Sequence, residues 1–220
     1  MSTKSVCDMS CGAMHEFALV LDKAGFDARM IQRVVNSPDN KQAEAMYTAL
    51  TNGALVNDLF QLINLFEIVV SEYYNHSRRL YLFGRKHRKS FNYHNEAITD
   101  KKYANVTTKL KPGRKFWVKV FQIKDLVTAE DCITKLRAEK AILVGAQGAT
   151  LVWEQKKEGL PINRRSVSFD EEDALWQDSS GNHGVPHILY RACGDYQFNL
   201  TSFKDNLNRA YCLLCFCDDE

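Results

Sequence analysis

Long apolar runs are scarce in this chain of 220 residues. None reaches the roughly 18–20 residues of a membrane-spanning helix. The most apolar stretch, Ala54–Val70, is interrupted by Asn57, Asp58, Gln61, Asn64 and Glu67. The N-terminal residues also contain no continuous apolar segment of the kind that a secretory signal requires. We therefore expect a cytoplasmic location and no contact with a membrane.

The proline and cysteine contents exclude two further classes of protein. With only four prolines, 45% hydrophobic residues and 25% charged residues, the composition is that of a globular chain and not of a disordered one. The seven cysteines are an odd number and lack the spacing of a small secreted disulfide scaffold, so we expect reduced thiols. A chain of this length buries enough core to fold without a metal or a disulfide, as one large or two small domains.

Acidic residues are nearly absent from one segment. Residues 76–120, which we call the basic segment, contain 13 Lys and Arg against only Glu96 and Asp100, a local charge of +11. The other 175 residues contain 16 Lys and Arg against 25 Asp and Glu, a charge of −9, so the whole chain carries only +2. The acidic excess is concentrated in residues 166–220, which contain three basic and ten acidic residues.

The first third of the chain is typical of helices. We expect residues 1–12 to be a flexible N-terminus and residues 13–75 to form a small helical bundle. Ser37-Pro38 is a favoured helix start, and Asn52-Gly53 is a favoured helix end. The last helix of the bundle is predicted from apolar residues at spacings of three and four: Leu55, Leu59, Leu62, Ile63, Phe66 and Val70.

The remainder is predicted to be a basic connector over residues 76–115 and an α+β domain with a mostly antiparallel sheet over residues 116–220. Thr128 begins a capping box for one helix, and Ala141–Trp153 is consistent either with one buried helix or with a strand, a turn and a helix. The strands are expected at Phe116–Ile123, Ser166–Phe169, His187–Arg191, Tyr196–Thr201 and Tyr211–Cys217. The last of these should be central and buried, because its residues are apolar on both faces.

Several stretches share a pattern with one group of proteins. They are EFALVLDKAGFDARMIQRVVNS, TAEDCITKL, LVGAQGATLVWEQKKEGLP, SFDEEDALWQDSSGNHGVP and FNLTSFKDNLNRAYCLLCFCDDE. Over residues 15–52 and 98–220 the chain resembles short hypothetical proteins of candidate-phyla bacteria, a group with no assigned function. The resemblance implies a self-standing bacterial protein with a helical N-terminal piece and an α+β C-terminal domain. It carries over no functional residue.

The basic segment contains the candidate binding residues. Its cations are Arg78, Arg79, Arg85, Lys86, Arg88, Lys89, Lys109, Lys111, Arg114 and Lys115, and its candidate stacking residues are Tyr81, Phe91 and Tyr93. We expect a non-enzymatic binding protein in which this segment contacts an acidic protein surface, either a partner's or the chain's own acidic C-terminal domain. The alternative is RNA or single-stranded nucleic acid, which needs cations for phosphates and flat side chains for bases. Packing of the cations onto Asp170–Asp173 would favour the first, and one exposed strip would favour the second.

Two glycines in Val144–Leu151 give a weaker signal. Gly145 and Gly148 are spaced like the G-x-x-G loop of KH domains, which clamps a nucleic-acid backbone. The alternative is close packing or a turn. Neither dinucleotide-binding nor Walker-type phosphate loops are present.

The cysteines and histidines predict no site. Cys7, Cys11, Cys212 and Cys215 would together supply four thiolates for zinc, but cysteines in a terminal strand usually behave as small buried apolar residues. A nucleophile–base pair can be imagined from Cys193 with either His183 or His187, but the sequence does not test whether these side chains meet in space. We therefore predict no metal, no cofactor and no catalytic residue, and leave enzymatic activity and oligomeric state open.

Overall fold

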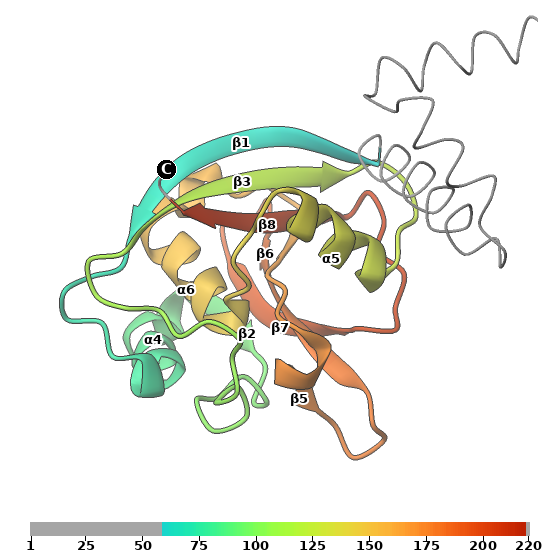
Figure 1. Cartoon of the computed structure of the whole chain (residues 1–220). Coiled ribbons are helices and arrows are strands. Elements are labelled where there is room, and N and C mark those ends of the chain that lie inside the picture. Colours follow the sequence, from blue (N-terminus) through green and yellow to red (C-terminus); the bar gives the residue numbers. More distant parts are fainter. Residues whose placement is uncertain (1–58, 219–220) are drawn as a thin grey trace, which may run out of the picture. The chain divides into compact units, whose positions relative to one another are not determined.

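The computed structural model describes residues 59–218, which lie in the compact unit Leu55–Glu220 (Figure 1). The expected flexible N-terminus and most of the expected helical bundle lie outside these residues. None of the helices in residues 59–218 is long and apolar enough to cross a membrane.

One mixed sheet organises the described part of the chain. Its strands are β1 (Phe60–Val69), β2 (Phe91–His94), β3 (Lys115–Ile123), β4 (Arg165–Val167), β5 (Trp176–Gln177), β6 (His183–Tyr190), β7 (Tyr196–Ser202) and β8 (Tyr211–Asp218). The order is β1-β3-β8-β4-β6-β7-β2, with β5 paired to β6. Only the β4–β8 and β2–β7 pairs are parallel. The prediction of a mixed fold with a mostly antiparallel sheet is therefore confirmed.

Strand β8 is an interior strand, as the sequence predicts. It pairs with β3 on one side and with β4 on the other. Five consecutive residues, Cys212–Phe216, are buried, because both faces of the strand are covered. Leu213 and Phe216 are three residues apart on β8, so their side chains point to opposite faces of the sheet. Phe121 pairs with Leu213 and therefore lies on the same face as Leu213.

Three α-helices accompany the sheet: α4 (Arg79–His87), α5 (Ala129–Ala138) and α6 (Gly145–Lys156). Helix α5 begins at the predicted capping box, in which Thr128 Oγ1 accepts from the Asp131 N–H at 3.1 Å and Asp131 Oδ2 accepts from the Thr128 N–H at 2.9 Å. Short 3-10 helices are η2 (His76–Arg78), η3 (Arg88–Ser90), η4 (Lys157–Gly159) and η5 (Glu172–Ala174).

Helices α5 and α6 pack on opposite faces of the sheet. The Lys135 ammonium of α5 lies 4.5 Å from the centre of the Phe121 ring. In α6, a Cβ added to Gly148 would lie 2.9 Å from Phe216 Cζ. Since Phe121 and Phe216 point to opposite faces, each face has its own helix.

The helix predicted over Leu55–Val70 is wrong for residues 60–69, which form β1. Antiparallel pairing with β3 supplies backbone partners along the strand, from Phe60 opposite Ile123 to Val69 opposite Lys115. A register shift between Leu62 and Asn64 interrupts the alternation of side chains, so the apolar spacing looks helical in the sequence. Tertiary pairing therefore overrides the local period.

Residues 76–115 are more than a connector, because they contain α4 and β2 and contribute to the core. Leu80, Phe83 and Tyr103 are each 1% exposed, and the Tyr103 hydroxyl donates to the Gly184 carbonyl at 2.8 Å. Helix α4 has an unusual N-terminal cap, since the Asp100 carboxylate accepts from the Leu80 N–H at 2.8 Å and the Tyr81 N–H at 3.0 Å. The cap comes from a residue beyond the helix, so no local signal marks the helix start.

Candidate binding surface around helix α4

Helix α4 has one face in the core and one in solvent. Phe83 packs edge-to-face on Trp153 and on Phe198, with ring centroids 5.5 and 5.9 Å away. The solvent side is defined by exposed residues at spacings of three and four, which continue into the flanking 3-10 turns. We call this surface the α4 face; it comprises Arg78, Tyr81, Leu82, Arg85, Lys86 and Lys89.

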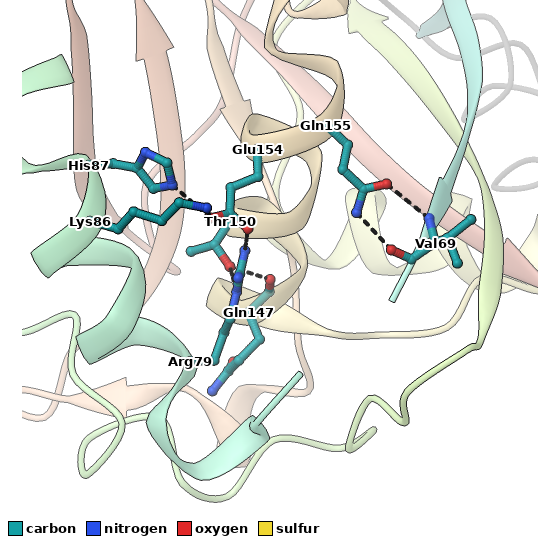
Figure 2. A network of polar contacts seen from close by, with 8 residues as sticks. All are labelled: Val69, Arg79, Lys86, His87, Gln147, Thr150, Glu154 and Gln155. Atoms are coloured by element: carbon teal, nitrogen blue, oxygen red, sulfur yellow. Dashed lines mark hydrogen bonds and ion pairs between the residues drawn. The ribbon is translucent and has the colours of Figure 1, made fainter. Parts of the chain in front are cut away.

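A polar network attaches α4 to α6 (Figure 2). Arg79 Nη2 lies 2.7 Å from Glu154 Oε2, and Arg79 Nε donates to Thr150 Oγ1 at 2.7 Å. His87 Nε2 lies 2.6 Å from Glu154 Oε1. Burial alone would raise the pKa of the Glu154 carboxyl, but Arg79 and His87 outweigh burial and hold this pKa below its usual range. The network orients α4, and it uses the charge of Arg79 internally.

Figure 2 also shows how α6 protects the edge of the sheet. Gln155 Nε2 donates to the Val69 carbonyl at 2.7 Å, and Gln155 Oε1 accepts from the Val69 N–H at 3.0 Å. The side-chain amide therefore replaces a neighbouring strand at the end of β1, where backbone groups would otherwise be unpaired.

The ten predicted cations divide into three groups. Arg79 and Arg114 have internal partners: Arg114 Nη2 contacts Asp218 Oδ1 at 2.8 Å. Lys86 lies 3.4 Å from Glu154 Oε1 with a side chain that is still 70% exposed. Seven make no ion pair within residues 59–218: Arg78, Arg85, Arg88, Lys89, Lys109, Lys111 and Lys115.

The chain's own Asp170–Asp173 segment does not receive these cations. In the described part of the chain, its one ion pair joins Glu171 to Arg137 of α5 at 3.0 Å. Asp170 accepts instead from the Thr107 N–H at 3.2 Å and is 1% exposed, and burial raises the pKa of its carboxyl. The basic segment therefore contacts this acidic stretch through the backbone N–H of Thr107, and its predicted cations form no ion pair with the stretch within residues 59–218.

The three predicted stacking residues differ in exposure. Tyr81 is 55% exposed and Tyr93 is 46% exposed, so both rings are accessible. Phe91 is only 9% exposed, and the centroid of its ring lies 4.9 Å from that of Trp153. It belongs to the core, so its prediction as a stacking residue is wrong. Tyr73, which is 96% exposed, was missed because it precedes the basic segment. Its polar neighbours Ser71, Glu72 and Asn75 are the signal that would have placed it outside a core.

Two hollows flank helix α4. The first, of about 670 Å³, is lined by Tyr73, Leu82, Arg85, Lys86 and the Arg79–Glu154 pair, among others. The second, of about 630 Å³, lies between α4 and residues 94–101. Arg85 lines both hollows, so one exposed guanidinium borders two concave surfaces beside the helix.

The glycine and cysteine signals have structural explanations. Gly145 and Gly148 belong to the buried first turn of α6 and not to a loop, so the KH-like alternative is wrong and the close-packing alternative is correct. Cys212 and Cys215 lie three apart on β8 and therefore point to opposite faces of the sheet. Burial raises the pKa of the Cys212 thiol to about 12.

Nothing in residues 59–218 brings three metal-ligating His, Cys, Asp or Glu side chains together. Cys7 and Cys11 lie outside the described residues. His187 is 3% exposed and its ring faces Tyr211, so it belongs to the core.

Comparisons with protein-family models, with curated proteins and with solved structures give no match. The resemblance to proteins of candidate-phyla bacteria stays a prediction.

Proposed function

We propose that this protein binds single-stranded nucleic acid, RNA in the first place, through the α4 face. The observation that carries the proposal is that α4 and its flanking turns combine an exposed tyrosine with the exposed cations Arg78, Arg85 and Lys89, which pair with no carboxylate of residues 59–218. Arg78 and Arg85 lie on the turns before and after Tyr81. The Arg78 guanidinium carbon lies 5.8 Å from the centre of the Tyr81 ring.

Each component matches one need of the ligand. Unpaired Lys and Arg neutralise phosphates and release counterions, which supplies most of the affinity for a polyanion. Exposed aromatic rings stack on bases that are not already paired in a duplex. The two hollows beside α4 add concave surface at the same place.

The second candidate is the acidic protein surface that the sequence analysis favours. It is supported by the Arg79–Glu154 and Arg114–Asp218 pairs, in which cations of the basic segment contact carboxylates. Exposed tyrosine rings also occur at protein interfaces, where this residue is enriched. The rings of Tyr73, Tyr81 and Tyr93 therefore fit either ligand, and a direct comparison of RNA with an acidic peptide decides between them.

The test compares a fluorescein-labelled ten-nucleotide RNA with a polyglutamate peptide of equal charge by fluorescence anisotropy at several salt concentrations. We expect tighter binding of the RNA, with a log–log salt slope of about −0.7 for each neutralised phosphate. Tyr81→Ser should weaken RNA binding by at least about fivefold, the lower end of the stacking contribution of one base, and Tyr81→Phe should restore it.

A matched pair of double variants tests the charges. Arg85→Gln/Lys89→Gln removes two cations from the α4 face, whereas Lys124→Gln/Lys204→Gln removes two exposed cations that follow β3 and β7. We expect only the first to lower RNA affinity and to flatten the salt slope. No RNA binding at low salt, equal effects of the two double variants, or tighter binding of the peptide would each overturn the proposal.

A further inference from the structure

The hollow between α4 and residues 94–101 contains a glycine, Gly84, at a position where a side chain has room. Gly84 lies inside helix α4, where glycine is a poor helix former. A Cβ at this position would lie 3.6 Å from His94 Nε2 and 3.9 Å from His94 Cε1, which are ordinary contact distances. The missing side chain leaves space above His94, and we call this space the Gly84 hollow.

The walls of the Gly84 hollow combine flat, apolar and hydrogen-bonding groups. Its lining includes Tyr81, which is 55% exposed, and the buried apolar residues Leu80 and Ile98. His94 Nε2 is buried and has no hydrogen-bond partner within residues 59–218. A buried polar atom without a partner carries a desolvation cost that a bound group with a matching hydrogen bond removes.

The charged groups of the hollow have both signs. Arg85, Arg88 and Lys101 line it, and all three are exposed. Two carboxylates, Glu96 and Asp100, line it as well. The hollow therefore offers cations for the anionic phosphate of a nucleotide and a carboxylate acceptor for the hydrogen-bond donors of its base.

We propose that the Gly84 hollow binds one base of a bound single strand and prefers a base with an exocyclic amino group. The inference rests on the proposed function and deepens it. Tyr81 stacks on the base, while Arg85 and Arg88 contact the flanking phosphates. The carboxylate of Glu96 accepts from the amino group, as acidic side chains do from cytosine N4. Uracil presents a carbonyl oxygen at the same position and is disfavoured there.

The experiment uses ten-nucleotide oligocytidylate and oligouridylate, which carry the same number of phosphates. The full chain should bind oligocytidylate about tenfold more tightly, the value of one good polar contact to a base edge. Gly84→Met fills the hollow without changing any charge, so it should remove the preference for oligocytidylate. Ser90→Met adds the same side chain to exposed Ser90 at the end of η3 and should keep the preference.

The outcomes separate the inference from the proposed function. If the wild type binds both oligonucleotides equally and Gly84→Met binds like the wild type, the hollow is not a base site and the α4 face still binds RNA. If the wild type binds neither, both proposals fall. Should Gly84→Met prove unfolded by circular dichroism, Glu96→Ala replaces it, because it removes the acceptor from an exposed wall residue; an undiminished preference for cytosine in that variant overturns the inference.

Discussion

Single side chains decide how α4 is held in place. The Glu154 carboxylate contacts Arg79 Nη2 at 2.7 Å and His87 Nε2 at 2.6 Å. The side chains of Arg79 and Glu154 are only 11% and 18% exposed. Partly buried charges of this kind are costly when one partner is removed, because the remaining charge keeps its desolvation penalty without compensation. At the residue scale, the stability of the α4 attachment therefore depends on one carboxylate.

Glu154→Gln should lower the free energy of unfolding by about 2 kcal/mol, since it leaves Arg79 without a counter-charge. The pKa of Glu154 is lowered in the folded protein. Its contribution is therefore complete above the unfolded pKa of about 4.3 and is lost as the pH falls through the lower folded value. Urea unfolding at pH 7 and below pH 4 measures both effects. Glu158→Gln, at an exposed position of η4, is the control; an equal loss in both variants would contradict the assignment.

His187 is a second residue with a calculable pH effect. Burial, with a smaller contribution from Arg165, lowers the pKa of its imidazole from 6.5 to about 3. Below about pH 6.5, His187 is therefore protonated in the unfolded chain but not in the folded chain, so the free energy of unfolding falls as the pH drops. Between pH 7 and pH 5 this amounts to about 2 kcal/mol. His187→Leu should make unfolding by urea less dependent on pH in this range, and an unchanged dependence would refute the prediction.

At the scale of elements, β8 connects the two halves of the sheet. It lies between β3, which continues to β1, and β4, which continues to β6 and β7. Its pairing with β3 is antiparallel and its pairing with β4 is parallel. Damage to β8 should therefore affect the whole described unit and not only one edge.

Leu214→Asp tests this role. Leu214 is 1% exposed on β8, and a carboxylate there would be buried without a partner. We expect soluble expression to be abolished, whereas Leu214→Ala should cost about 2–5 kcal/mol and leave a folded protein. The soluble fraction on expression and a thermal unfolding curve are the measurements. A normally folded Leu214→Asp variant would show that β8 is not the central strand.

At the scale of the whole molecule, the near-neutral charge conceals an unbalanced distribution. Of the 13 cations in the basic segment, four have a carboxylate partner within residues 59–218: Arg79, Lys86, Arg114 and Lys119. The other nine make no ion pair in that part of the chain, so the acidic residues there do not neutralise the segment internally. Long-range attraction of a polyanion is the physical consequence of such an unbalanced surface.

Local signals in the sequence determined part of this protein. The capping box at Thr128, the alternating strand Phe116–Ile123 and the apolar strand Tyr211–Cys217 depend on residues close together in the chain, and the structure contains all three elements. The basic segment was also visible, because charge can be counted without a fold.

Tertiary structure decided the rest. Strand β1 is a strand because β3 pairs with it, and α4 begins where it does because Asp100 caps it from beyond the helix. The same folding buries Phe91, uses Arg79 and Arg114 internally and leaves Arg85 exposed between two hollows. These outcomes depend on contacts between residues far apart in the chain, whose energies exceed local preferences, so a period or a charge count alone does not predict them.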